Sequence, residues 1–115
     1  KTFPTTGQDA TLTGLQNVLA GYQCGTVYSA SYLEAQASAA LAIYLASGTK
    51  PPAALVNGKT SDSQAKVDVP SVLLTPLWVT SASMAKTVVK DGFVDAKKLC
   101  AGALAKACAA ADIKP

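Results

Sequence analysis

A strand-to-helix turn near the start of the chain constrains the fold more than any other feature. Residues 3–6 read as the end of a strand, and they run through Gly7-Gln8-Asp9-Ala10 into an amphipathic helix pattern. In open α/β sheets, ligands bind in the crevice outside the carboxyl ends of the strands. Asp9, at the mouth of this turn, is therefore a candidate ligand group, and a helix N-cap is the competing interpretation.

Strand and helix patterns then alternate. Apolar residues recur at helical spacing over residues 10–20, and Gly21 is a natural stop. Residues 25–28 are rich in β-prone side chains and predict a short strand. This succession of strand, helix and strand is typical of an α/β protein.

A second helix is expected after residue 30. Ser31 and Glu34 have the spacing of a capping box, and the helix is expected to end at Ser47 and Gly48. A short strand is expected at residues 54–56, followed by an exposed polar loop over residues 59–66.

The last third of the sequence predicts one more strand and further helices. Residues 71–79 are apolar but interrupted by Pro76, which indicates an edge strand or a bent strand. Thr80 is expected to cap a helix over residues 81–90, and Asp95 a final helical stretch.

Composition excludes several classes of function. All ten basic residues are Lys and they are scattered, so a nucleic-acid partner is not expected. The chain has no His, and its seven acidic residues are spread singly, so we expect no enzyme, no metal site and no cofactor. The apolar runs are too short to span a membrane. Lys1 is not an initiator Met, and we expect that the chain has been trimmed.

Three cysteines remain to be assigned. Cys100 and Cys108 would lie about 12 Å apart along one straight helix, too far for a disulfide. A helix break at Gly102 would bring them together, and we favour a local disulfide over free thiols in a chain that looks exported. Cys24 is expected to be a buried apolar residue.

Five short segments together carry a family resemblance. They are TGQDA at 6–10, TVY at 26–28, NGK at 57–59, DVPSVLLTP at 68–76 and VKDGF at 89–93. In this order and spacing, the sequence closely resembles the C-terminal part of sugar-binding proteins of ABC importers, of the D-xylose-binding type. The resemblance covers nearly the whole chain, and the spacing of Cys100 and Cys108 is similar to that in actinobacterial members.

The resemblance implies an α/β fold of the type I periplasmic-binding kind. Such proteins have two three-layer αβα lobes joined by three crossing strands, and this chain would be incomplete alone. Residues 1–29 and about 76–115 would belong to one lobe, and about 30–70 to the other. Asp9 matches the family's Gly-Gln-Asp carboxylate, which accepts hydrogen bonds from sugar hydroxyls. Ser29 stands at the hinge position where xylose binders carry a Lys, and Trp78 is expected to pack rather than to stack on a sugar.

The implied function is reversible binding of a monosaccharide such as xylose. The implied partners are ABC permease subunits and either the rest of a parent chain or a second copy. The implied location is extracellular or at the cell surface, or periplasmic in a Gram-negative source. The alternative is a proteolytic or independent fragment that self-associates as a structural protein without binding sugar.

Overall fold

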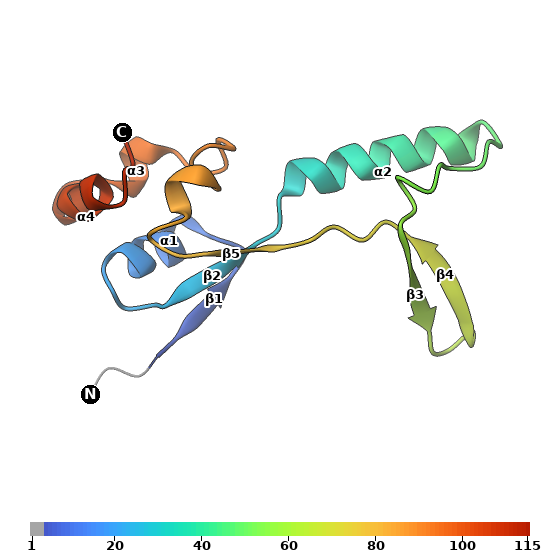
Figure 1. Ribbon diagram of the computed structural model, residues 1–115, viewed down its shortest axis with the longest axis horizontal. Helices are drawn as coiled ribbons and strands as arrows, with labels where there is room; N and C mark the ends of the chain where they lie inside the picture. The colour runs from blue at the N-terminus through green and yellow to red at the C-terminus, as the bar shows by residue number, and fades with distance from the viewer. Residues whose placement is uncertain (1–3) are drawn as a thin grey trace. The chain divides into compact units, whose positions relative to one another are not determined.

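The computed structural model describes residues 4–115, which form a mixed α/β protein, as the sequence predicts. The chain divides into two compact units (Figure 1). The first unit combines Lys1–Ser29 with Pro76–Pro115, and the second unit is Ala30–Thr75. The assignment of segments to the two lobes of a receptor stays a prediction.

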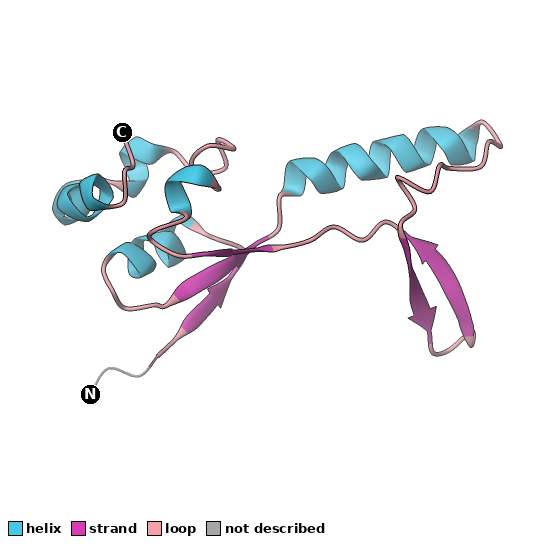
Figure 2. Ribbon diagram, in the orientation of Figure 1, coloured by secondary structure: helices cyan, strands magenta, loops and turns pink. Residues whose placement is uncertain are grey.

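A three-stranded sheet forms the centre of the first unit (Figure 2). Its strands are β1 (Thr6–Gln8), β2 (Gly25–Tyr28) and β5 (Leu77–Val79), in the order β1-β2-β5. Strand β1 pairs with β2 in parallel, and β5 pairs with β2 antiparallel. The prediction of β2 is confirmed. The first strand begins at Thr6, where the predicted strand ends, and Phe3 lies outside the described residues.

Helix α1 (Leu12–Leu19) connects β1 to β2. Its buried side chains, Leu15 and Val18, face the sheet because helical residues three apart share one side. Gly21 follows with a φ of 81°, a conformation that suits glycine and ends the helix. The predicted helix is confirmed, although it is shorter at both ends.

The remainder of the first unit consists of short helical pieces. They are η1 (Met84–Lys86) and η2 (Gly102–Leu104), both 3₁₀ turns, and the helices α3 (Ala96–Leu99) and α4 (Ala105–Ala110). The helix predicted over residues 81–90 is wrong. Thr80 donates its amide to Ser83 Oγ at 2.9 Å, and Thr87 Oγ1 donates to the Ser83 carbonyl at 2.9 Å. Such bonds between hydroxyls and the main chain compete with helix formation.

Two further predictions in this region are confirmed. Asp95 Oδ1 accepts hydrogen bonds from the amides of Lys97 at 2.8 Å and Lys98 at 3.3 Å, so it caps α3. Gly102, with a φ of 63°, separates α3 from α4.

The core of the first unit lies between one face of the sheet and the helical pieces. Its buried residues include Leu15, Thr26, Tyr28, Val79, Met84, Val88, Leu99, Cys108 and Ile113. The other face of the sheet is open within this unit, since Trp78 is 49 % exposed and Gln8 is exposed. Parallel strands are usually covered on both faces. The described residues of this unit therefore supply two layers rather than three.

The second unit begins with α2 (Ser31–Ala46). The expected capping box is absent, because the helix starts one residue earlier. The Ala30 carbonyl already accepts from the Glu34 amide at 3.3 Å, so Ala30 is the N-cap and Ser31 lies inside the helix. No residue of α2 is buried, although its apolar side chains are distributed around the whole helix. Its end at Ser47, with Gly48 at a φ of 66°, is as predicted.

A β-hairpin completes the second unit (Figure 2). Strands β3 (Gly58–Asp62) and β4 (Val67–Ser71) pair antiparallel where the sequence predicts a loop, and no strand forms at residues 54–56. Asn57 extends the pairing beyond β3, because its amide group donates to the Leu73 carbonyl at 2.9 Å and accepts from the Leu73 amide at 2.7 Å. The polar hairpin is held together by the main-chain pairing of β3 with β4 and by the two hydrogen bonds between Asn57 and Leu73.

Candidate ligand-binding site

The carboxyl ends of β1 and β2 lie at the same edge of the first unit's sheet. The strands are parallel, and Gln8 and Val27 are partners in the register. Asp9 follows β1 directly, and Ser29 follows β2 directly. The structure therefore brings the two predicted binding residues to one edge.

Asp9 is exposed and does not cap the helix. Its φ is 71°, a left-handed conformation that Asp tolerates better than most residues. The N-cap is Thr11, whose Oγ1 accepts from the Gly14 amide at 3.2 Å. The cap interpretation of Asp9 is thus wrong, since the turn between β1 and α1 is two residues longer than the pattern suggests. Within residues 4–115, no hydrogen bond engages the Asp9 carboxylate.

The turn after Asp9 is held from the neighbouring strand. Ala10 is fully buried with a φ of 45°, and its amide donates to Thr26 Oγ1 at 3.2 Å. Thr26 belongs to β2 and is 1 % exposed. Asp9 and Ala10 are both left-handed, and the Asp9 side chain is exposed to solvent.

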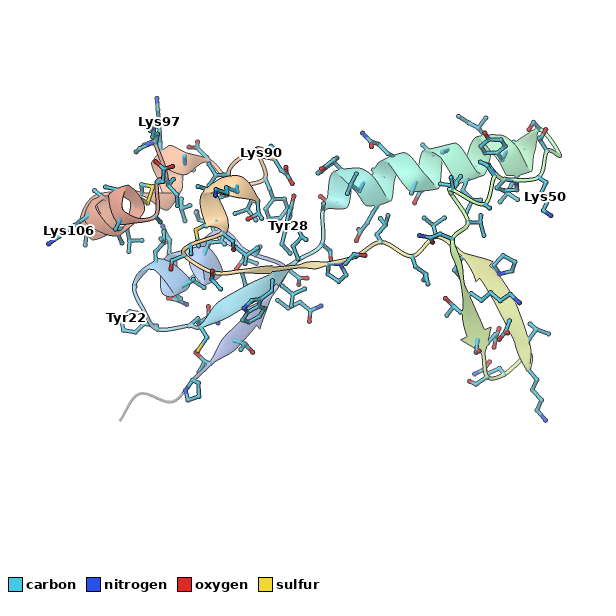
Figure 3. All side chains as sticks on the ribbon, in the orientation of Figure 1. Tyr22, Tyr28, Lys50, Lys90, Lys97 and Lys106 are labelled. Carbon is cyan, nitrogen blue, oxygen red and sulfur yellow. A yellow bond between two sulfur atoms is a disulfide. The ribbon has the colours of Figure 1, made fainter. Side chains whose placement is uncertain are left out.

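Ser29 is exposed and is the last residue of the first unit's N-terminal segment. Its hydroxyl can donate and accept, but it is short and uncharged. The residue before it, Tyr28, anchors the end of β2 in the core. The ring centroids of Tyr28 and Phe93 are 4.9 Å apart, and the ring planes meet at 54° (Tyr28 in Figure 3).

Sequence reasoning missed Asp91 as part of this edge. Tyr28 Oη donates to Asp91 Oδ2 at 3.3 Å, so the loop before α3 brings a second exposed carboxylate beside the end of β2. In the sequence, Asp91 stands out only as part of the VKDGF segment at residues 89–93, which contributes to the family resemblance. Asp91 thus contributes an exposed carboxylate that accepts from the hydroxyl of Tyr28, the last residue of β2.

Trp78 contacts Gly25 of β2 through its ring and remains 49 % exposed, and its expected role in packing rather than sugar stacking stays a prediction. It lies opposite Val27 in the register, and its ring covers Gly25. A Cβ added to Gly25 would stand 2.5 Å from the ring of Trp78, so glycine is the residue that allows this close approach.

The cysteines divide as follows. Cys100 and Cys108 form the expected disulfide, visible as a yellow bond in Figure 3, with their Cα atoms 5.8 Å apart. Cys24 carries a free thiol and is exposed, so the prediction that it is buried is wrong. It directly precedes β2, at the end of that strand opposite to Ser29.

The candidate site is an open edge rather than an enclosed cavity. A groove of about 370 Å³ lies in the second unit, between α2 and the segment that follows β4, and neither Asp9 nor Ser29 lines it. Among the residues described, no group of three or more His, Cys, Asp or Glu side chains is placed to hold a metal ion. The edge offers hydroxyl and carboxylate oxygens, which can bind a polyhydroxylated ligand through hydrogen bonds.

None of the helices in residues 4–115 is both long enough and apolar enough to cross a membrane. No family model matches the chain.

Three known proteins are similar to this chain. The D-xylose-binding periplasmic protein of Escherichia coli is 41 % identical over 87 residues, which is 76 % of this chain. The multiple sugar-binding periplasmic receptor ChvE of Rhizobium radiobacter is 32 % identical over 94 residues, or 82 % of the chain. The D-xylose-binding periplasmic protein of Haemophilus influenzae is 31 % identical over 87 residues, or 76 % of the chain.

The matches cover only part of each relative. This chain corresponds to 25 % of the length of the two D-xylose-binding proteins and to 26 % of the multiple sugar-binding receptor. These matches confirm the resemblance to D-xylose-type sugar-binding proteins that the five sequence segments indicate. The relatives are periplasmic binding proteins, not enzymes.

Proposed function

Because this chain is homologous to part of the D-xylose-binding periplasmic proteins, we propose that the protein containing it captures a monosaccharide such as xylose reversibly. It acts as the substrate-binding component of an ABC sugar importer and is not an enzyme. The observation that carries the proposal is the exposed carboxylate of Asp9 at the carboxyl edge of β1 and β2. No bond of the sugar is broken, so no nucleophile or general base is required.

In this proposal, Asp9 accepts hydrogen bonds from sugar hydroxyls. A charged acceptor suits this task because hydrogen bonds to ionised groups are stronger than those between neutral groups. Ser29 contributes a hydroxyl at the neighbouring strand end. Since Ser lacks the charge of the Lys that xylose binders carry there, the preferred sugar or its affinity differs from theirs.

The two compact units correspond to parts of the two lobes of a receptor. The chain passes from one unit to the other after Ser29 and again before Pro76. These are the positions at which hinge residues would absorb the backbone change when the lobes close on a ligand. The remaining sugar contacts come from parts of the receptor to which this chain does not correspond.

The proposed partners and location follow from the same assignment. The protein is exported, to the periplasm in a Gram-negative source or to the cell surface otherwise, and delivers its sugar to the permease subunits of an ABC importer. The Cys100–Cys108 disulfide supports export, because such bonds persist in oxidising compartments.

A second candidate function is self-association without sugar binding. The observation that favours it is the exposure of apolar surface on α2, which buries no side chain. In addition, within residues 4–115 the outer strands β1 and β5 each pair on one side only. Such edges and faces favour pairing with another chain.

A titration separates the two candidates. Xylose, arabinose and glucose are titrated into the full-length protein and into this chain alone, and light scattering after size exclusion gives the mass of each. Saturable binding of one sugar by the full-length protein supports the receptor. A stable dimer of the chain, with no heat from any sugar in either sample, supports self-association instead.

A further inference from the structure

Thr26 has a buried polar side chain and is 1 % exposed. It lies in the central strand β2, opposite Gly7 of β1 and Val79 of β5. Its side chain is on the face of the sheet that the helical pieces cover. A buried hydroxyl at such a position requires a hydrogen-bond partner.

The partner is the main chain of the β1–α1 turn. Thr26 Oγ1 accepts from the amide of Ala10 at 3.2 Å. Ala10 is itself fully buried, and its amide belongs neither to the β1–β2 ladder nor to α1. Without the hydroxyl, this amide would be a buried donor with no partner, which folded proteins avoid.

The turn that this bond holds is strained. Asp9 and Ala10 have φ values of 71° and 45°, and two successive non-glycine residues in the left-handed region are unfavourable. Such a conformation persists only where the surrounding structure fixes it. Here the fixing contacts are the burial of Ala10 and its hydrogen bond to Thr26.

We infer that Thr26 is a positioning residue for the carboxylate of Asp9. It is buried and does not touch the ligand, but its hydroxyl sets the direction in which the chain leaves β1 and hence the place of the Asp9 side chain. This inference rests on the proposed function. Thr26 also lies in the strand that leads to Ser29, three positions before it, so one strand carries both the residue that positions Asp9 and the second predicted binding residue.

Two substitutions test the hydroxyl separately from the shape of the side chain. Thr26→Val has nearly the same shape and no acceptor, whereas Thr26→Ser keeps the acceptor. Thr87→Val is the matched control, since Thr87 also bonds the main chain from a half-buried position but contacts the Ser83 carbonyl and not the β1–α1 turn. Xylose affinity of the full-length protein is measured by calorimetry, well below the melting temperature of each variant.

The Kd of Thr26→Val is expected to rise about tenfold or more, because a carboxylate misplaced by about 1 Å loses productive geometry. Thr26→Ser is expected to bind nearly as tightly as the wild type. Thr87→Val is expected to melt earlier with an unchanged Kd. A wild-type Kd for Thr26→Val, or an equal loss in Thr26→Ser and Thr26→Val, would overturn the inference.

A double-mutant cycle shows whether Thr26 acts through Asp9. Asp9→Gly removes the carboxylate and tolerates the positive φ, so the backbone of the turn can stay in place. In this background, Thr26→Val is expected to cause no further loss of affinity. The same fold-loss with and without the Asp9 carboxylate would show a general structural role and overturn the inference.

The outcomes separate this inference from the proposed function. If the wild type does not bind xylose, or if Asp9→Gly binds as the wild type does, the proposed function fails. If Asp9→Gly weakens binding and Thr26→Val does not, only the role of Thr26 fails.

A measurement on the wild type covers the case in which Thr26→Val does not fold. The Ala10 amide is expected to exchange its hydrogen slowly, with further slowing when xylose saturates the protein. Exchange as fast as that of an exposed loop amide would contradict the role of Thr26.

Discussion

The hydroxyl of Tyr28 donates to Asp91 Oδ2 at 3.3 Å and so joins two parts of the chain that are 63 positions apart. Tyr28 is the last residue of β2, and Asp91 lies in the loop that leads to α3. The contact ties the strand end that carries Ser29 to the C-terminal half of the first unit.

Tyr28→Phe is expected to lower the free energy of unfolding by about 1 kcal/mol, because it removes this hydrogen bond and leaves the ring contact with Phe93 in place. Urea unfolding of the full-length protein measures the change. Tyr22→Phe is the control, since Tyr22 is 71 % exposed, and no change is expected there. Equal effects of the two substitutions would show that the Tyr28 hydroxyl contributes nothing specific.

Gly25→Ala is expected to destabilise the first unit by about 1–3 kcal/mol through overpacking. The added methyl group would stand 2.5 Å from the ring of Trp78 and 2.7 Å from the Val79 carbonyl oxygen, which is main chain and cannot rotate away. Thermal unfolding measures the loss. For comparison, a methyl group added at Gly14 in α1 would stand 3.2 Å from Thr11 Oγ1 and 3.8 Å from Gln23 Oε1, both side-chain atoms, and Gly14→Ala gains helix propensity, so a smaller change is expected. A Gly25→Ala variant as stable as the wild type would show that β2 and β5 are not packed as described.

Loss of the Cys100–Cys108 disulfide is expected to cost about 2–3 kcal/mol, the chain-entropy value for a loop with a sequence separation of 8. The double variant Cys100→Ser/Cys108→Ser is compared with the wild type in chemical denaturation. Cys24→Ser is the control, because the Cys24 thiol is free and exposed. If the double variant is no less stable than Cys24→Ser, the bridge has no structural role.

The turn of the β3–β4 hairpin is expected to loosen in acid. Hydrogen bonds from the amides of Ala65 and Gln64 hold the pKa of Asp62 below its usual value. A lowered folded-state pKa stabilises the turn above the ordinary aspartate pKa, and this stabilisation is lost as the pH falls through the folded-state value.

Amide chemical shifts of Gln64 and Ala65, followed during acidification, should therefore titrate together below the usual pKa of an aspartate. Asp62→Asn is expected to remove this titration and to leave the shifts of the first unit unchanged. If the two amides titrate in the same way in Asp62→Asn, another group controls the turn.

Much of the fold was predictable because local signals agreed with packing. The strand at β2, the end of α1 at Gly21 and the cap of α3 by Asp95 each depend on residues close in sequence. The hairpin β3–β4 was not predictable in this way. Its strands are polar and exposed, so the apolar alternation that identifies most strands is missing.

The sequence predicted which edge of the sheet carries the candidate site, but not the conformation of the turn that contains Asp9. Parallel strands put Asp9 and Ser29 at one edge, and this follows from topology. In the left-handed turn at Asp9, the Ala10 amide donates to the hydroxyl of Thr26, 16 positions further along the chain, and no local pattern encodes such a contact. The local pattern also left a helix cap by Asp9 open, and it does not show that Thr11 caps α1 instead, after a turn whose Ala10 amide bonds to β2.

Calorimetric titration of xylose into the full-length protein, its Asp9→Gly variant and its Asp112→Gly variant tests the central claim most directly. Asp112 is a matched control, because it is also exposed, has a φ of 56° and belongs to the first unit. Loss of a charged hydrogen-bond acceptor is expected to cost about 1.5–3 kcal/mol, or roughly ten- to a hundredfold in Kd. The account predicts this loss for Asp9→Gly and wild-type affinity for Asp112→Gly. Wild-type affinity in Asp9→Gly would contradict it.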